Sequence, residues 1–280
     1  MKLLRYGLPG KEKPGVLDKN GQIRDLSGII PDITPETLSP ASLEKLKKID
    51  PAQLPQIAGN PRIGPPVNHV PKIIAVGLNY RDHANEATMK IPTEPVLFMK
   101  TITSYSGPND TVILPKGSIK GDWECELGIF IGTKAQYVSE ADALKHVAGY
   151  CIVNDVSERH FQLERGPQWM KGKGCDTFCP TGPWLVTPDE VADPQNLEVM
   201  CEVSGQVMQK ASTKDMIFDC KTIISYTSQF LTLMPGDLIA TGTPSGVGLG
   251  RNRFLKPSDT MRLTITGLGE QRQKVAAYPG

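Results

Sequence analysis

GDWECELGIFI, residues 121–131, is the stretch that most directly indicates the fold and the chemistry. Its second half is apolar and predicts a strand inside a core sheet. In a strand alternate residues share a face, so Asp122, Glu124 and Glu126 lie on one side, roughly 7 Å apart. Neighbouring carboxylates repel one another unless solvent or a cation compensates. The stretch is therefore either one wall of a metal site or an exposed edge strand.

A second polar segment follows an apolar strand in GYCIVNDVSERHFQ, residues 149–162. The strand ends at Asp155, and a short helix is predicted to begin near Ser157. On that helix Arg159 and Gln162 are three residues apart and face the same way. A strand-end carboxylate beside Arg and Gln is typical of an active site. The alternative makes Asp155 or Ser157 a helix cap and Arg159 a surface charge.

The acidic residues of these two segments suggest a cation. Glu124, Glu126 and Asp155 offer only oxygen ligands, which favour Mg²⁺ first and then Mn²⁺ or Ca²⁺. Three carboxylates leave coordination positions open for water or substrate. Asp122 is an additional acid whose role the sequence leaves open.

A possible proton-transfer pair lies in GLNYRDHANE, residues 77–86. His83 and Glu86 are three residues apart, so one helical turn brings them together. A carboxylate beside an imidazole orients it and raises its basicity, which suits activation of a water molecule. The alternative is a routine pair at the start of a helix.

Two glycine-rich segments complete the set of candidate site residues. In WMKGKGCDTF, residues 169–178, Lys173 lies between glycines, either facing an enolate or carboxylate or within a solvated loop. PGDLIATGTPSGVG, residues 235–248, lacks the Lys-Ser/Thr of a P-loop and the helix of a dinucleotide fingerprint. We therefore expect no nucleotide, and interpret this loop as offering backbone and hydroxyl donors to a small anion.

Composition narrows the class of protein. The 280 residues carry a net charge of +1 without a long Lys/Arg run, which argues against nucleic-acid binding. No apolar stretch is long enough to span a membrane or to form a signal peptide. The six cysteines form no CxxC pair and are expected to be reduced. These features predict a cytoplasmic protein with one large domain, or one large and one small domain.

The 27 glycines and 24 prolines favour short strands and turns, and hence a β-rich α+β fold. Asn20-Gly21 predicts a hairpin, and six prolines between residues 51 and 71 predict a linker without regular structure. Strands are predicted at residues 2–6, 15–18, 22–26, 72–77, 96–100, 122–131, 184–186, 197–203, 238–241 and 261–266. Helices are predicted at residues 42–49, 139–147 (from a capping box) and 215–234 (from apolar spacing).

Taken together, five motifs resemble the fumarylacetoacetate hydrolase family between about residues 72 and 268. They are GLNYRDHANE, DWECELG, GYCIVNDVSERHFQ, WMKGKGCDTFCPTGP and PGDLIATGTPSGVG, in this order. The first 66 residues resemble, more loosely, bacterial members that act on 2,4-diketo-3-deoxy sugar acids or are labelled ureidoglycolate lyases. The resemblance implies a rolled mixed β-structure, with an N-terminal subdomain and linker over residues 1–66 and a catalytic domain over residues 67–280. It also implies a homodimer or a dimer-based oligomer.

The resemblance assigns roles to individual residues. It implies Mg²⁺ or Mn²⁺ on Glu124, Glu126 and Asp155, and a water-activating pair, His83 and Glu86, on a mobile lid. It further implies that five residues contact the substrate: Tyr80, Arg159, Gln162, Lys173 and Thr243.

The implied activity is hydrolysis of the C3–C4 bond of a 2,4-diketo acid to pyruvate and a second carboxylic acid. The expected substrate is a 2,4-diketo-3-deoxy sugar acid, such as the L-rhamnonate or L-fuconate derivative, and Lys173 is expected to stabilise the pyruvate enolate. Arg81, Asn85 and Ser245 are candidate partners for its hydroxylated tail. Three other enzymatic activities stay open, namely oxaloacetate decarboxylation, keto-diacid decarboxylation with isomerisation, and ureidoglycolate cleavage. A catalytically silent binding protein is the alternative of another class.

Overall fold

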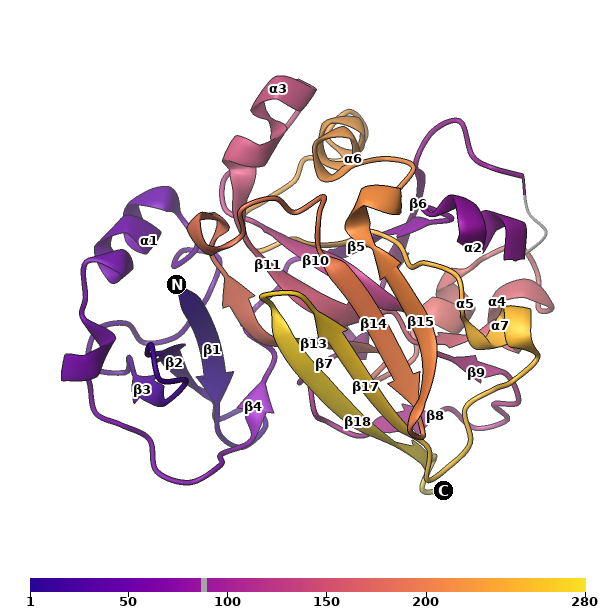
Figure 1. Ribbon diagram of the computed structural model, residues 1–280, viewed down its shortest axis with the longest axis horizontal. Helices are drawn as coiled ribbons and strands as arrows, with labels where there is room; N and C mark the ends of the chain where they lie inside the picture. The colour runs from indigo at the N-terminus through magenta and orange to yellow at the C-terminus, as the bar shows by residue number, and fades with distance from the viewer. Residues whose placement is uncertain (87–89) are drawn as a thin grey trace.

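The structure is a computed structural model and describes residues 1–86 and 90–280. Its main sheet has eleven strands, most of them arranged in one continuous path (Figure 1). In spatial order the path is β3 (Ile23–Asp25), β2 (Lys13–Leu17), β1 (Lys2–Tyr6), β13 (Cys179–Val186), β11 (Val147–Asn154), β10 (Cys125–Ile131), β16 (Leu238–Ala240), β5 (Ile73–Gly77) and β6 (Val96–Lys100).

Two short strands lie off this path, and one of them rolls the sheet. β4 (Ile63–Gly64) pairs with β1, and β7 (Tyr105–Ser106) pairs in parallel with β13. β6 lies at one end of the path, and β7 follows it closely in the chain. Because β7 pairs with β13 near the middle of the path, the sheet curls back on itself. The predicted rolled, β-rich α+β fold is therefore confirmed.

A second, five-stranded sheet packs on the first. Its order is β15 (Gln206–Ser212), β14 (Glu198–Val203), β17 (Thr260–Ile265), β18 (Gly269–Ala277) and β8 (Val112–Leu114). Leu127 and Ile129 of β10 share one hydrophobic core with Val199, Cys201 and Leu263 of this sheet. Glu126 of β10 consequently faces the other way, toward the interior of the roll.

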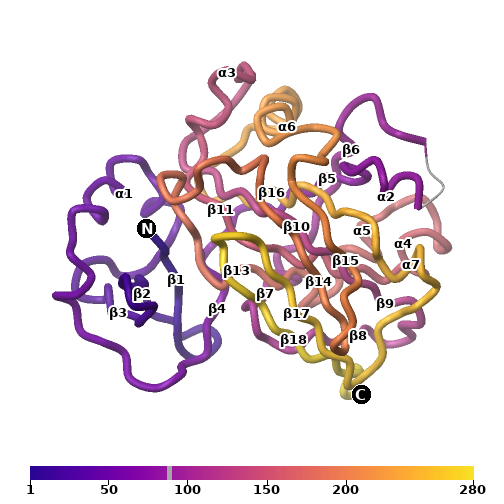
Figure 2. Tube along the Cα trace, viewed as in Figure 1, coloured from indigo at the N-terminus to yellow at the C-terminus, as the bar shows by residue number. Residues whose placement is uncertain are grey.

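The helices are short. They are α1 (Pro40–Lys47), α2 (Arg81–Glu86), α3 (Glu140–Ala143), α4 (Arg159–Leu163), α5 (Met170–Lys173), α6 (Cys220–Thr227) and α7 (Gly248–Arg251). Five 3₁₀ turns accompany them: η1 (Pro51–Gln53), η2 (Ile102–Ser104), η3 (Leu144–His146), η4 (Pro188–Glu190) and η5 (Thr213–Asp215). The chain trace in Figure 2 gathers α2, α4, α5 and α7 at one end of the molecule, far from the N-terminal strands. None of the described helices is long and apolar enough to cross a bilayer.

Several predicted elements are confirmed within a residue or two, including the N-terminal hairpin and the strands beginning near residues 72 and 96. β1 pairs with β13, so the N-terminal strands extend the main sheet. The Pro-rich segment contains η1 and β4, so the prediction that it holds no regular structure is wrong in detail. The domain division at residue 66 stays a prediction.

Two predicted helices are shorter than expected. The helix predicted over residues 215–234 is α6 alone, which begins after Asp219, whose carboxylate accepts a hydrogen bond from the Thr222 N–H at 2.9 Å. It ends early because Leu233 forms backbone hydrogen bonds with Ala135, and a helical backbone cannot make that bridge. The helix predicted over residues 139–147 is α3 followed by η3, and Ser139 donates to the Asp142 side chain without capping the backbone.

Candidate metal centre and active site

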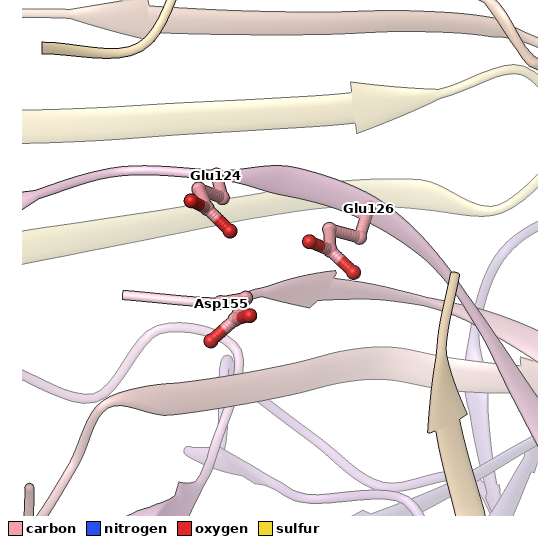
Figure 3. A group of neighbouring side chains, drawn as sticks. All are labelled: Glu124, Glu126 and Asp155. Atoms are coloured by element: carbon pink, nitrogen blue, oxygen red, sulfur yellow. The ribbon is translucent and has the colours of Figure 1, made fainter. Parts of the chain in front are cut away.

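The three carboxylates of Glu124, Glu126 and Asp155 converge, and one oxygen from each lies within 4.8 Å of the others (Figure 3). Glu126 lies on β10, Glu124 directly precedes the first residue of β10, and Asp155 directly follows the last residue of β11. The Asp155 N–H donates to the Glu124 carbonyl at 2.9 Å, which holds the two strand ends together. All three side chains are buried, so the exposed-edge alternative is wrong.

Buried cations surround two of these carboxylates. Lys173 Nζ donates to Glu124 at 2.6 Å and to Asp155 at 2.9 Å. Arg159 Nη2 donates to Glu124 at 2.6 Å, and Lys100 Nζ donates to Asp155 at 2.5 Å. Burial opposes ionisation of Glu124, but Lys173 and Arg159 outweigh it and hold the pKa of Glu124 below its ordinary value.

Glu126 differs from its neighbours because its hydrogen-bond partner is the Gly242 backbone N–H, at 2.8 Å. No Lys or Arg of the described residues forms an ion pair with it. Burial, followed by the charges of Asp155 and Glu124, raises the pKa of Glu126 well above its ordinary value. The site thus contains one carboxylate that lacks a positive partner.

This donor set fits a divalent cation. Four buried carboxyl groups (Asp122, Glu124, Glu126 and Asp155) face three buried cations (Lys100, Arg159 and Lys173), which leaves one carboxyl group, Glu126, without a cation. Carboxylate oxygens are the ligands that Mg²⁺ and Mn²⁺ prefer. Nothing in the set is a soft ligand.

The strand predicted over residues 122–131 is broken, and Asp122 lies on β9 (Gly121–Asp122), which pairs with β12 (Ser157–Glu158). Its carboxylate accepts hydrogen bonds from Arg159 Nε at 2.7 Å and from the Gly248 and Leu249 N–H groups at 2.6 and 3.0 Å. Asp122 is therefore not part of the converging triad. It holds the guanidinium and the start of α7 in place.

The His83–Glu86 pair forms as predicted on α2. His83 Nδ1 lies 3.6 Å from a Glu86 carboxylate oxygen, slightly beyond hydrogen-bond distance. Both oxygens of Glu86 accept the Gly246 N–H at 3.0 Å, and Asp82 accepts the Ser245 hydroxyl at 2.6 Å. These contacts attach α2 to the loop that follows β16.

One small cavity, of about 40 Å³, brings most predicted residues together. Seven of the site residues predicted from the sequence line this cavity: His83, Glu124, Glu126, Arg159, Gln162, Lys173 and Thr243. The remaining lining residues are apolar, and Trp169 is one of them. Arg159 donates to the Gln162 side chain at 3.0 Å, as expected from their spacing. A larger cavity, of about 610 Å³, lies between α1 and the N-terminal hairpin and contains none of these residues.

Four predicted substrate contacts differ from expectation. Tyr80 is 1% exposed and does not line the cavity, and burial, with a contribution from the Glu126 charge, raises the pKa of its phenol well above the ordinary value. Arg81 and Asn85 are exposed and lie outside the cavity. Thr243 does line it, but its hydroxyl donates to the Cys125 carbonyl at 3.0 Å.

Sequence reasoning missed Lys100 and the Gly242 N–H. A backbone amide leaves no trace in the side-chain pattern. Lys100 had a signal, since it alternates with Phe98 on one face of an apolar strand and a charge on a buried face needs a partner.

A family comparison agrees with this geometry. The profile described as "Fumarylacetoacetate (FAA) hydrolase C-terminal" matches residues 72–276. The chain belongs to the fumarylacetoacetate hydrolase family.

Curated relatives of this family member are similar over nearly their whole length. The 2,4-didehydro-3-deoxy-L-rhamnonate hydrolase of Sphingomonas sp. (strain SKA58) is 55% identical over 281 residues, which are 99% of this chain and 97% of that protein. A Burkholderia cenocepacia J2315 protein named as a hydrolase without a stated substrate is 58% identical over 276 residues, 98% of each chain.

Solved structures of the family have the same fold. The fumarylacetoacetate hydrolase of psychrophilic Exiguobacterium antarcticum is 34% identical, with a TM-score of 0.85 over 99% of this chain and 100% of that one. The maleylpyruvate hydrolase of Sphingobium sp. SYK-6, in complex with manganese(II) and pyruvate, is 30% identical, with a TM-score of 0.83 over 99% of each chain. This family member is thus an acylpyruvate-type hydrolase acting on carbon–carbon bonds, and the binding-protein alternative is set aside.

Proposed function

We propose that the chain hydrolyses the C3–C4 bond of a 2,4-diketo-3-deoxy sugar acid, with the L-rhamnonate derivative as the preferred substrate and pyruvate and lactate as products. The observation that carries the reaction is the convergence of Glu124, Glu126, Lys173 and His83 on one cavity. The relative named as a 2,4-didehydro-3-deoxy-L-rhamnonate hydrolase supports the choice of substrate.

We assign a divalent cation to Glu124, Glu126 and Asp155, with Mg²⁺ before Mn²⁺. The manganese complex of the maleylpyruvate hydrolase supports a cation of this class. When bound, the cation supplies a Lewis acid that polarises the keto-acid oxygens and compensates negative charge. Its charge would also offset the unpaired negative charge of Glu126.

His83 is assigned as the base that activates water. Its Nδ1 faces Glu86, so Nε2 is the nitrogen left to accept a proton from water. The hydroxide oxygen then bonds to C4 while the π electrons of the C4 carbonyl move onto its oxygen. When this carbonyl re-forms, the C3–C4 bond breaks and its electron pair stays on pyruvate as an enolate. Protonation at C3, which returns the proton taken from water, completes pyruvate, and the C4 fragment leaves as the second carboxylic acid.

Lys173 and Arg159 are assigned to the substrate's negative charge. Lys173 lines the cavity with a buried ammonium group, which is suited to stabilising the enolate. Arg159 is held rigidly by Asp122 and supports Gln162 beside it. Because the Thr243 hydroxyl already donates to Cys125, and the Gly242 and Gly246 N–H groups to Glu126 and Glu86, we leave the substrate carboxylate to Lys173 and Arg159.

The residues that form the cavity wall indicate which substrate tail fits. Leu163, Trp169 and Leu249 form an apolar surface there, while the Ser245 hydroxyl is donated to Asp82. A short 1-hydroxyethyl tail suits this wall, because its methyl group can pack against it.

The test is a product analysis with metal-stripped protein, reloaded with Mg²⁺ or Mn²⁺. We expect pyruvate and lactate from the diketo-deoxyrhamnonate, and no turnover after chelation. Acetylpyruvate, fumarylpyruvate and oxaloacetate serve as comparison substrates. A tenfold preference for a simple acylpyruvate, about 1.4 kcal/mol in transition-state binding, would contradict the sugar-acid assignment alone. Release of CO₂ from oxaloacetate without hydrolysis of any acylpyruvate would contradict the hydrolytic reaction.

A further inference from the structure

Lys100 is a fully buried lysine at the end of β6, and its side chain is 0% exposed. Its ammonium group donates to Asp155 Oδ1 at 2.5 Å, to the Val156 carbonyl at 3.3 Å and to the Lys173 carbonyl. An ammonium group has three N–H donors, so all of them are used. A buried charge requires such complete pairing, because desolvation otherwise favours the neutral form.

These acceptors belong to two different parts of the site. Asp155 and Val156 follow β11, whereas Lys173 is the last residue of α5. The neighbouring Thr101 hydroxyl donates to the Gly174 carbonyl at 2.6 Å, so the end of β6 holds α5 at two consecutive residues. Lys100 thus connects a carboxylate of the acidic triad with the backbone of the lysine that lines the cavity.

The Asp155 carboxylate is held on both of its oxygens. Lys100 occupies Oδ1, and Lys173 Nζ occupies Oδ2 at 2.9 Å. With Oδ1 anchored to a residue outside the cavity, the carboxylate cannot rotate freely toward its neighbours. Groups that orient a ligand in this way affect metal affinity by roughly 10–100-fold in other metal sites.

We propose that Lys100 is a positioning residue, which orients the Asp155 carboxylate for the metal and sets the place of Lys173 for the reaction. This inference rests on the metal site of the proposed function. It assigns Lys100 no contact with substrate.

A matched control exists in the same sheet. Lys72 pairs with the buried Asp237, which also accepts the Met234 N–H at 2.6 Å. The Asp237 carbonyl accepts the Ile131 N–H, five residues along β10 from Glu126, or roughly 17 Å. Removing Lys72 therefore disrupts a lysine–aspartate pair of the same chemical type away from the triad.

The experiment measures Mn²⁺ affinity by calorimetry on metal-stripped wild type, Lys100→Met, Lys100→Gln and Lys72→Met, together with melting temperature and kcat and KM. We expect Lys100→Met to weaken Mn²⁺ binding 10–100-fold and to lower kcat more than it changes KM at saturating metal. Lys100→Gln, which keeps two donors, should fall between Lys100→Met and wild type. Lys72→Met should lower the melting temperature and leave the Mn²⁺ dissociation constant within twofold of wild type.

The outcomes separate this inference from the proposed function. If Lys100→Met does not fold, Lys100→Gln decides by the same measurement. Mn²⁺ affinity within twofold of wild type in the folded Lys100 variants overturns the positioning role and leaves the metal site intact. Equal weakening in Lys72→Met also overturns it, because the effect would then be one of general stability. A wild type that binds no divalent cation overturns the metal site and the inference with it.

Discussion

His83 lines the cavity together with Glu124 and Glu126, yet none of the described residues forms a hydrogen bond with its Nδ1. Glu86, at 3.6 Å, is its nearest carboxylate partner on α2. This geometry suits a residue that handles a proton and leaves the cation to the triad.

The first prediction therefore separates catalysis from metal binding. His83→Ala should lower kcat/KM by roughly 10²- to 10⁴-fold, the range for loss of a general base, and leave Mg²⁺ affinity unchanged in calorimetry. His146→Ala is the control, since His146 contacts Thr133 and does not line the cavity. Loss of Mg²⁺ binding in His83→Ala would show that the histidine belongs to the metal site.

The second prediction concerns Glu126, the carboxylate without a positive partner. Glu126→Gln should abolish Mg²⁺-dependent activity and the rise in melting temperature that Mg²⁺ produces, because ligand binding stabilises only a protein that binds it. In metal-free protein the variant should melt no lower than wild type, since burial and the charges of Asp155 and Glu124 already disfavour the ionised form of Glu126. Differential scanning calorimetry with and without Mg²⁺ checks both, with the exposed Glu198→Gln as control. A Mg²⁺-induced shift that survives in Glu126→Gln would contradict the ligand assignment.

At the scale of elements, the wall of the cavity depends on how β5 meets the start of α5. A Cβ atom on Gly77, the last residue of β5, would lie 2.6 Å from the indole of Trp169. Trp169 also packs edge-on against Phe98 of β6, with ring centroids 5.5 Å apart. The indole is thus a fixed wall of the cavity.

The third prediction follows from that boundary. Trp169→Leu should raise kcat/KM for acylpyruvates with longer tails, relative to the sugar acid, by about tenfold or more. Gly77→Ala should lower kcat/KM for every substrate, because the new methyl group must displace the indole. Trp184→Leu, on β13 and outside the cavity, is the matched control. An unchanged substrate ratio in Trp169→Leu would show that the tail binds elsewhere.

The lengths of elements were the least predictable feature at this scale. Apolar spacing continues through residues 228–234, but those residues leave α6 because Leu233 pairs with Ala135. The strand through residue 122 is interrupted because the Asp122 carboxylate binds backbone N–H groups of α7. In both places a contact between distant segments overrides the local pattern.

At the scale of the whole molecule, the roll unites segments far apart in the sequence. Its path of strands begins at β3 and ends at β6, and the unpaired backbone groups of an edge strand can pair with another chain. The fourth prediction is a homodimer or a dimer-based oligomer, so light scattering should give at least about twice the 30.5 kDa of one chain. A mass near 30.5 kDa at working concentration would contradict it.

The sequence by itself determined the residue types of the site and the order of the strands that carry them. Alternation in a strand and i,i+3 spacing in a helix depend only on local backbone geometry, so the Glu124–Glu126 pair and the His83–Glu86 pair could be derived without a structure. Asp155 joined the Glu124–Glu126 pair as a candidate metal ligand because the three residues offer only oxygen ligands, and the resemblance to a family implied the same three residues.

Only the tertiary structure decided which charges are paired. Lys100 and Asp155 are 55 residues apart in the chain, and their ion pair exists because β6 and the end of β11 meet inside the roll. The same packing removed Tyr80 from the cavity, bound Asp122 to Arg159 and left Glu126 without a cation. The physical reason is that desolvation favours the pairing of buried charges, and which partner is within reach depends on how the whole sheet is rolled.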